Sequence, residues 1–253
     1  MGLRAVGYRI YESRLAHGLA PDALPRHVGV ILDGNRRWAR ATGAETSAGH
    51  RAGAERVLDL LRWCEEAGIQ VVTLWLLSTD NLARPEAELA PLLGIIDDVV
   101  ARVAASPRRR VRAVGALDLL PTWLAGRLKA HAERTAEVEG LHVNVAVGYG
   151  GRREIADAVR SLLHEHAALG TSIEELAQVL DVEQIAQHLY TRGLPDPELV
   201  IRTSGEQRLS GFLLWQSAHS EFYFCEALWP DFRRVDFLRA LRSYAQRERR
   251  FGG

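Results

Sequence analysis

The segment Asp33-Gly34-Asn35-Arg36-Arg37-Trp38 brings a carboxylate, a glycine and two guanidinium groups together in one short stretch. A carboxylate can hold a divalent cation, guanidinium groups bind phosphate oxygens, and a glycine lets the backbone approach a ligand closely. These residue types suit a diphosphate bound together with a divalent cation. Spacing alone leaves an ordinary Asp-Gly turn with solvated arginines as an equal alternative. A phosphatase with an aspartate nucleophile is disfavoured, because Asn35 stands where such enzymes carry a second aspartate.

A second polar motif runs from Ser78 to Pro85. Serine, threonine, aspartate and asparagine are the preferred residues at a helix N-terminus, so capping explains much of it. Capping does not explain Arg84, because the helix dipole disfavours a cation at that end. A bound anion would resolve this conflict.

A third motif, Arg202 to Ser210, combines two arginines with hydroxyls and a glycine. Its composition suits a loop that wraps a diphosphate, and a polar surface loop is the alternative. Glu221 follows among aromatic residues, where an acid is more often paired or metal-bound than free. The glycine-rich stretch 148–152 lacks the spacing of a dinucleotide-binding loop, and we interpret it as a tight turn.

Apolar periodicity predicts the elements that must position these motifs. The predicted strands are 27–33, 70–77, 111–117, 141–149, 198–203, 213–216 and 222–225, and the predicted helices are 52–68, 85–103, 121–138, 151–169, 172–176, 182–190 and 235–249. This alternation predicts an α/β fold with a central, mostly parallel sheet and helices on both faces. We expect one domain over residues 1–253, with an N-terminal helical extension (1–24) and a basic C-terminal helix and tail (235–253). Ligands of such sheets bind beyond the carboxyl ends of the strands, where the three motifs lie.

The composition excludes several classes of protein. The 253 residues include 32 Lys+Arg and 32 Asp+Glu, so the net charge is zero and a general basic field for nucleic acid is absent. Two cysteines, Cys64 and Cys225, make no disulfide framework, which favours a reducing cytoplasm. No apolar stretch approaches the roughly 20 residues that span a bilayer, and the N-terminus does not resemble a signal peptide.

Taken in order, short blocks from about Pro25 to the C-terminus resemble the cis-prenyltransferase family, typified by undecaprenyl diphosphate synthase. The matching blocks are His27 to Trp38, Gly49-His50-x-x-Gly53, Ser78-Thr-Asp-Asn-x-x-Arg-Pro85, Gly148 to Arg152, Arg202-Thr-x-Gly-Glu-x-Arg-x-Ser210, Phe212 to Gln216, Trp229 to Phe232 and Arg249 to Gly253. The resemblance implies a butterfly-shaped α/β homodimer. It also implies an alkyl transferase that condenses isopentenyl diphosphate with an allylic diphosphate and requires Mg²⁺.

Residue roles follow from the resemblance by position. It implies that Asp33 holds Mg²⁺ and assists loss of the allylic diphosphate, and that Glu221 is a second metal-linked acid. It assigns the proton acceptor to Asn81. Because a neutral amide is a poor base, we expect Asn81 to orient the group that takes the proton. Substrate contacts are implied for Gly34, Asn35, Arg36, Arg37, Trp38, Thr46, His50, Ser78, Thr79, Asp80, Leu82, Arg84, Arg202, Arg208, Leu209 and Ser210.

Departures from the long-chain members of the family predict the product. Thr46, Asp80 and Leu82 replace an arginine, a glutamate and a tryptophan, and the pattern is closer to the short-chain actinobacterial type. Leu76 stands where long-chain members carry a small residue, so we expect it to limit chain length. The expected product is (2Z,6E)-farnesyl diphosphate made from geranyl diphosphate. The alternatives are a long-chain decaprenyl or undecaprenyl diphosphate synthase and a non-catalytic partner subunit.

The resemblance carries two further expectations. The C-terminal segment from Arg247 to Gly253 is expected to dock on a partner subunit, since in the family this tail reaches the partner's diphosphate site. We expect a cytoplasmic enzyme that binds no nucleic acid. The sequence leaves open a peripheral contact with the inner face of the cell membrane.

Overall fold

The computed structural model describes residues 11–247, and within them six strands form one sheet in the order β3-β4-β2-β1-β5-β6. Every neighbouring pair is parallel, as the βα alternation predicts. The strands are β1 His27–Ile31, β2 Val71–Ser78, β3 Arg109–Val114, β4 Leu141–Tyr149, β5 Leu199–Arg202 and β6 Glu221–Phe224. Because β1 lies between β2 and β5, the residues that follow these three strands meet at one edge of the sheet.

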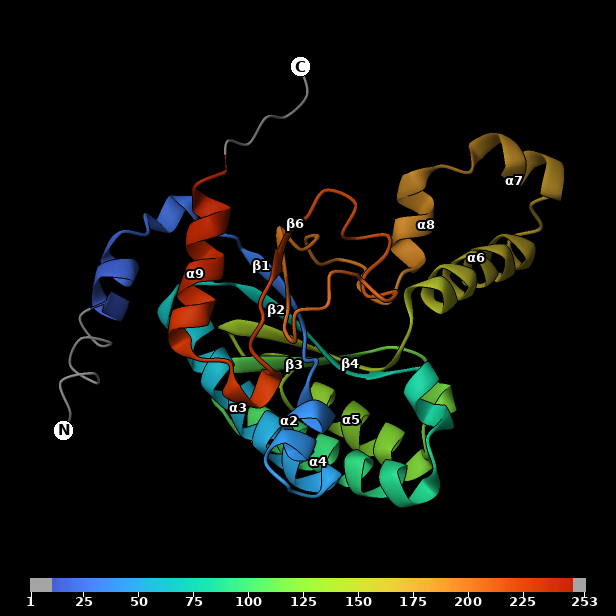
Figure 1. Ribbon diagram of the computed structural model, residues 1–253. Coiled ribbons are helices and arrows are strands. Elements are labelled where there is room, and N and C mark those ends of the chain that lie inside the picture. The colour runs from blue at the N-terminus through green and yellow to red at the C-terminus, as the bar shows by residue number, and fades with distance from the viewer. Residues whose placement is uncertain (1–10, 248–253) are drawn as a thin grey trace.

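Helices α2 to α8 lie beside this sheet in two groups, and α9 belongs to neither (Figure 1). Helices α2 to α5 gather on one side, whereas α6 to α8 extend from the other end of the sheet as a projecting arm. The helices are α2 Asn35–Ala41, α3 Thr46–Glu66, α4 Glu86–Ala104, α5 Thr122–Arg134, α6 Gly151–Ala168, α7 Ile173–Val179, α8 Val182–His188 and α9 Arg234–Ala245, and the 3₁₀ turns are η1 Pro21–Ala23, η2 Asp80–Ala83, η3 Leu117–Leu119 and η4 Trp229–Asp231. Of the predicted N-terminal extension, residues 11–17 are helical and residues 1–10 lie outside the described part.

The larger core lies between the sheet and the helices α3, α4 and α5. It joins Val28 and Val30 of β1 to Val57 and Leu61 of α3 and to Ile96 of α4, all buried. A smaller, aromatic cluster contains Tyr149, Phe212 and the partly buried Trp75. The ring of Trp75 stacks on that of Phe212 with 5.2 Å between the ring centroids. These cores hold the strand ends rigid on both sides of the central strands.

Three elements differ most from the sequence prediction, and in addition β3 ends at Val114 rather than at residue 117 and α5 at Arg134 rather than at residue 138. Residues 213–216 form a turn rather than a strand, and Leu213 has a φ of 45°, which no strand residue adopts. Helix α2 begins directly after the Asp-Gly pair, where a turn was expected. Helix α3 begins at Thr46 rather than at residue 52. Helix α7 begins with a capping box, in which the Ser172 hydroxyl accepts from the Glu175 N–H and the Glu175 carboxylate accepts from the Ser172 N–H.

A β-bulge interrupts β2 just before its carboxyl end. Trp75 pairs with Ala146 and Leu77 with Val147, so Leu76 is the extra residue. Strict alternation predicts that Leu74 and Leu76 share a side, and both contact the larger core. However, Leu77 also joins that core, because a bulge changes the direction of the side chains that follow it. The bulge therefore places Leu76 next to the polar end of the strand without breaking the sheet.

None of the helices within residues 11–247 is both long enough and apolar enough to cross a membrane.

Candidate active site

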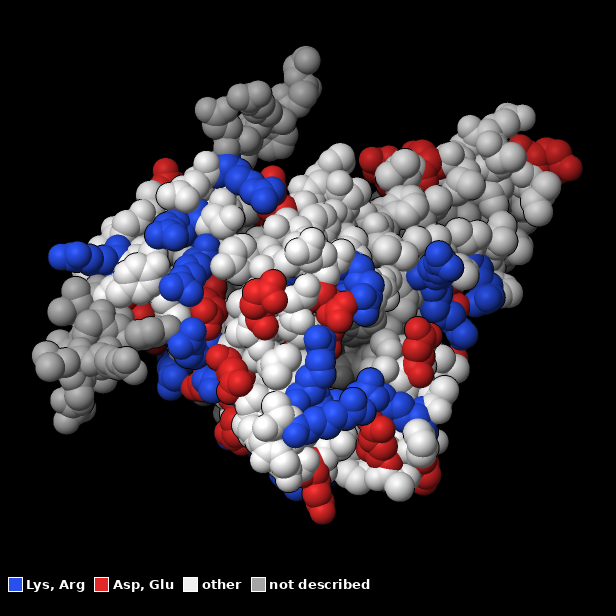
Figure 2. Space-filling view, in the orientation of Figure 1, with Lys and Arg blue, Asp and Glu red and all other residues white. Residues whose placement is uncertain are grey.

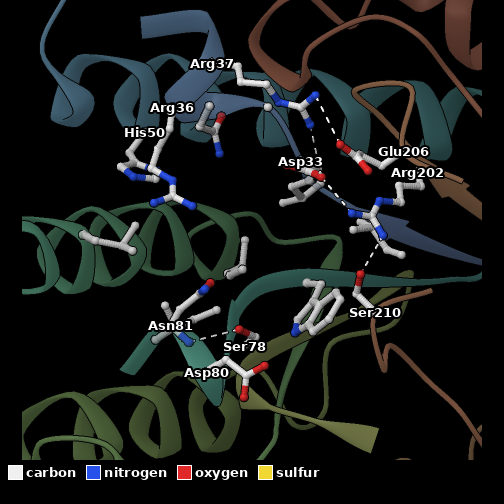
Figure 3. Close-up of a pocket in the computed structure, with 18 of the residues that line it drawn as sticks. Asp33, Arg36, Arg37, His50, Ser78, Asp80, Asn81, Arg202, Glu206 and Ser210 are labelled. Atoms are coloured by element: carbon white, nitrogen blue, oxygen red, sulfur yellow. Dashed lines mark hydrogen bonds and ion pairs between the residues drawn. The ribbon is translucent and has the colours of Figure 1, made fainter. Parts of the chain in front are cut away.

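A pocket of about 580 Å³ opens at the carboxyl ends of β1, β2 and β5. It is lined on one side by α2 and the residues after β1, and on the other by β2 and η2. Figure 2 shows the hollow on this face, bordered by arginine and acidic side chains, and Figure 3 shows the side chains inside it. Predicted site residues that line it are Asp33, Gly34, Asn35, Arg36, Arg37, His50, Leu76, Ser78, Asp80, Asn81, Arg84, Arg202, Arg208 and Ser210.

Asp33 is fixed by the backbone on which it sits. Its N–H donates to the Thr203 hydroxyl at 3.0 Å, and that hydroxyl donates to the Asp33 carbonyl at 2.7 Å. Gly34 follows with a φ of 115° and caps α2, a conformation that side chains disfavour. A Cβ at Gly34 would also lie 3.0 Å from Leu228. The turn therefore needs glycine, and it directs the N-terminus of α2 toward the pocket.

The Asp33 carboxylate lies between two arginines, Arg37 and Arg202 (Figure 3). Arg202 donates to it at 2.9 Å, and the Arg37 guanidinium lies 3.5 Å away. Burial by itself would raise the pKa of Asp33, but hydrogen bonds from Arg202 and Ser204 and the charge of Arg37 lower it overall. Asp33 is therefore ionised at neutral pH and can accept a metal ion.

Helices α2 and α3 approach closely beside the pocket. A Cβ on Gly49 of α3 would lie 2.3 Å from the Asn35 backbone carbonyl oxygen, so only glycine permits this contact. The approach brings His50 of α3 to the pocket wall near Arg36 (Figure 3). Burial, and then the charge of Arg84, lower the pKa of His50 to about 4. His50 is therefore neutral near pH 7 and can donate one hydrogen bond.

The polar residues after β2 form the opposite wall. The Ser78 hydroxyl accepts a hydrogen bond from the Asn81 N–H at 3.1 Å, which holds η2 against the strand end. Arg84 follows, with 16% of its side chain exposed and its guanidinium 3.1 Å from the Glu88 carboxylate. Burial, and then the charge of Arg36, lower the pKa of Arg84. Two arginines thus lie close enough to share one anion.

The loop after β5 has a strained backbone. Within the described residues, the non-glycine residues with positive φ are Ser204 (80°), Ser210 (51°) and Leu213 (45°), all in this loop. Such conformations cost of order 1–3 kcal/mol each and cluster at functional sites. Arg202 crosses the loop and donates to the Ser210 hydroxyl at 2.8 Å. Arg202 also donates to the Arg208 carbonyl, so these bonds hold the loop around the Arg202 guanidinium.

Six predicted site residues do not line the pocket. They are Trp38, Thr46, Thr79, Leu82, Leu209 and Glu221. The Trp38 indole N–H donates to the Asp231 carboxylate at 2.9 Å and supports α2 from outside. Leu82 and Leu209 pack against the two cores. The six residues therefore do not face the pocket of their own chain, and their direct contact with substrate stays a prediction.

Glu221 lies at the wrong end of the sheet to share a metal ion with Asp33. It begins β6 and pairs with Leu199, which pairs with Val28 near the start of β1. Asp33 follows the other end of β1. The Glu221 carboxylate instead forms an ion pair with Arg247. A shared ion would need a Glu221 from a second copy of the chain.

The pocket also contains residues that the sequence analysis did not assign. Arg40 lines it from α2, one turn beyond Arg36, and predicting α2 as a helix would have identified it. Glu206 lines it as well, and its carboxylate lies 3.6 Å from the Arg37 guanidinium. Within residues 11–247 no cluster of three His, Cys, Asp or Glu could hold a metal ion. A metal ion at Asp33 would therefore take most of its ligands from substrate oxygens and water.

A small apolar cavity of about 40 Å³ lies behind the charged pocket, between α3 and α4. Its walls are largely aliphatic and include Val57, Ile96 and Val99. Leu32, Leu76 and Leu92 line both spaces and so form the passage between them. The arrangement suits a ligand with an anionic head and a short apolar tail.

Comparisons with known proteins agree with this chemistry. Residues 31–252 match the family model of undecaprenyl diphosphate synthase. A (2Z,6E)-farnesyl diphosphate synthase of Thermobifida fusca is 66% identical over 251 residues, 99% of this chain and 98% of the relative. Isoprenyl transferase 1 of Streptomyces avermitilis is 60% identical over 250 residues, 99% of this chain and 97% of the relative. The crystal structure of lavandulyl diphosphate synthase from Lavandula x intermedia in complex with dimethylallyl diphosphate has a TM-score of 0.85 and 34% identity, covering 92% of this chain and 100% of that chain.

Proposed function

The chain belongs to the cis-prenyltransferase family, and we propose that it joins isopentenyl diphosphate to geranyl diphosphate and releases (2Z,6E)-farnesyl diphosphate. The observation that carries the short product is the cavity of 40 Å³ behind Leu76. By the same measure one water molecule needs about 10–15 Å³, so the space behind Leu76 holds about three waters and leaves little room for added isoprene units. Relatives named as short-chain Z-isoprenyl and (2Z,6E)-farnesyl diphosphate synthases support the same product.

The allylic substrate binds with its diphosphate at the N-terminus of α2. The N–H groups of the first turn, Arg36 and Arg37 supply donors there, and the helix dipole favours the anion. Neutral His50 adds one donor. The apolar tail enters the passage beside Leu76. These contacts stabilise the negative charge that develops as the diphosphate leaves, and stabilisation of developing charge is usually what lowers the barrier most.

Mg²⁺ is the proposed cofactor, and Asp33 is the residue that would hold it. The site fits a single hard cation, because the carboxylate is ionised, one-third exposed and directed into the pocket. Mg²⁺ commonly uses one or two carboxylates and completes its shell with phosphate oxygens and water. When bound, the cation would neutralise charge on the departing diphosphate.

Isopentenyl diphosphate binds in the ring formed by Arg202, Arg208 and Ser210. Planar guanidinium groups recognise phosphate oxygens in pairs, and the loop already holds Arg202 in place. Asn81 lines the same pocket, and in this proposal it orients the group that accepts the proton. Fixing both substrates next to each other supplies much of the rate through proximity.

Two alternatives are less well supported. A long-chain synthase would need a wider passage than the one that Leu76 leaves. A non-catalytic partner subunit would lack part of the arginine and aspartate constellation, which this chain retains around one pocket.

The proposed assembly is a homodimer built through the projecting arm. Large apolar side chains are exposed along the arm although they have no function in the pocket: Val159, Leu163, Leu169, Ile173, Val179, Leu180 and Val182. Contiguous exposed apolar residues mark interaction surfaces. Light scattering on Leu163→Asp should show a shift toward monomer, and an unchanged dimer would contradict this interface. The predicted docking segment Arg247–Gly253 lies outside the described part except for Arg247, which forms an ion pair with Glu221 of the same chain. Two free, buried cysteines support a cytoplasmic location.

Product analysis tests the proposed function. The purified chain is incubated with Mg²⁺, radiolabelled isopentenyl diphosphate and, in separate reactions, dimethylallyl, geranyl or (E,E)-farnesyl diphosphate. We expect geranyl diphosphate to give the highest kcat/KM and a C15 product after dephosphorylation and chromatography. A product of C50 or longer, or no condensation with any primer, would refute the proposal.

A further inference from the structure

Glu88, in the first turn of α4, lies behind the arginines that face the allylic side of the pocket. Its carboxylate is 3.1 Å from the Arg84 guanidinium and 3.9 Å from that of Arg36. Arg36 belongs to α2 and Arg84 precedes α4, so this single carboxylate links the two sides of the pocket. Figure 3 shows Arg36 beside His50, away from the Asp33–Arg202 pair.

The contact between Glu88 and the arginines is ionic rather than a fitted hydrogen bond. Within residues 11–247, one oxygen of Glu88 is fully buried and has no hydrogen-bond partner, although it is the oxygen nearest to both guanidinium groups. A buried carboxylate that serves only to fix the fold normally accepts well-aligned hydrogen bonds. Arg36, by contrast, keeps 51% of its side chain exposed and can turn toward a ligand.

From this geometry we infer that Glu88 is a positioning residue that takes the place of the allylic diphosphate in the empty site. It holds Arg36 and Arg84 near each other while no substrate is bound, and it competes with the diphosphate for them. This inference rests on the proposed function, because it concerns the allylic half of the same pocket.

The charges around the pocket explain why Glu88 and a diphosphate would compete for Arg36 and Arg84. Two groups of cations face the two halves. On one side Asp33 and Glu206 pair with Arg37, Arg202 and Arg208, whereas on the other side Glu88 is the acid beside Arg36 and Arg84. Guanidinium groups this close repel each other, and Arg84 is also partly desolvated. A carboxylate between them relieves the repulsion. A diphosphate relieves it better, because it brings more charge and more acceptor oxygens.

If Glu88 competes with the diphosphate, removing its charge should raise the affinity of the site for an anion, whereas removing a residue that only supports the arginines should lower that affinity. Glu88→Gln keeps the size of the side chain and an acceptor oxygen but removes the charge. The empty site then has two uncompensated cations, so an anion should bind more tightly. If Glu88 merely aligned Arg84, its loss should weaken binding instead.

The experiment measures the affinity of inorganic diphosphate by titration calorimetry for wild type, Glu88→Gln and Glu86→Gln. Glu86 is a matched control, since it lies exposed in the same helical turn and loses the same charge. We expect Glu88→Gln to tighten binding by about three- to tenfold at low salt, and the gain to shrink in 0.5 M NaCl. Glu86→Gln should change affinity by less than about twofold, because exposed charges are screened. The KM for geranyl diphosphate should fall by the same factor as the dissociation constant.

Unchanged or weaker binding in Glu88→Gln, or an equal gain in both variants, would overturn the inference. If Glu88→Gln lowers the melting temperature strongly, Glu88→Asp retains the charge but withdraws it from Arg36, and it should tighten binding to a smaller extent. Weaker binding in that variant would also overturn the inference. Wild-type condensation reports separately on the proposed function, because the diphosphate titrations need no turnover.

Discussion

Replacing Leu76 with alanine should lengthen the product. Leu76 lines both the charged pocket and the apolar cavity, and the bulge in β2 places it at the passage between them. A chain that grows by one isoprene unit must push five more carbons past this side chain. Forcing extra carbon into a packed space costs roughly 1–3 kcal/mol, which slows the next addition by about 5- to 150-fold.

Removing the isobutyl group should relieve that cost. Each buried methylene contributes about 0.8 kcal/mol, so an isoprene unit that finds room is favoured by several kcal/mol. We expect Leu76→Ala to raise the ratio of C20 and longer products to C15 by at least about tenfold, with less than a threefold change in the rate of the first addition. The assay is chromatography of radiolabelled products under single and multiple turnover.

A second leucine on the same strand separates a passage effect from a packing effect. Leu74 is fully buried and lines neither space. Leu74→Ala should lower the free energy of unfolding by about 2–5 kcal/mol and leave the C15 product unchanged. Leu76 is only partly buried, so its replacement should cost less stability. An exclusive C15 product from Leu76→Ala, or an equal lengthening in Leu74→Ala, would refute the argument.

Three further predictions concern the site and its supports. Asp33→Asn should lower kcat/KM by well over tenfold, at least about 1.4 kcal/mol of barrier, without lowering the melting temperature. EDTA should abolish wild-type activity until Mg²⁺ is restored. A loss of kcat/KM smaller than about tenfold in Asp33→Asn would exclude the assigned role. Burial lowers the pKa of His27 to about 4 from an ordinary value of 6.5. Between these two pH values the unfolded chain binds a proton on His27 that the folded chain does not, so the free energy of unfolding should fall as the pH drops from 6.5 to 4, by roughly 3 kcal/mol. Urea unfolding measures this change, and a flat profile across that window would contradict it. Glu154 is fully buried and accepts hydrogen bonds from Tyr149, Tyr190 and Gln216. Glu154→Ala should therefore lower the free energy of unfolding by about 3 kcal/mol. Glu137→Ala is the exposed control, and an equally small change in both variants would show that the three donors find other partners.

The strands could be predicted from the sequence because their signal is local. The strands β1, β2 and β4 are continuous apolar runs that end in polar motifs. The first and last residues of these strands lie within two positions of the predicted ones. Helix α2 lacks such a signal. It buries only Ala39, and it docks on α3 through a glycine contact rather than through an apolar stripe. Hydrophobic periodicity cannot detect a helix of that kind.

The candidate site likewise has features that follow from the sequence and features that depend on how distant segments pack. The motifs after β1, β2 and β5 could be grouped in advance, because carboxyl ends of parallel strands share one edge of a sheet. The separation of Glu221 from Asp33 depends on the direction of β6, which a mostly parallel sheet leaves open for a short last strand. Because β6 runs parallel to its neighbour, Glu221 at its start lies at the amino ends of the strands. The position of Glu88 between Arg36 and Arg84 depends likewise on how closely α2 and α4 approach.

The order of the strands also determines when the site can form during synthesis. Strand β1 pairs with β5, and the ion pair between Asp33 and Arg202 joins residues 169 positions apart. A nascent chain therefore exposes one edge of β1 until nearly all of the protein has left the ribosome. Such long-range parallel pairing is slow, and open edges invite association with other chains. We expect refolding of this protein to be slow and sensitive to concentration, with substrate binding as the last property to return.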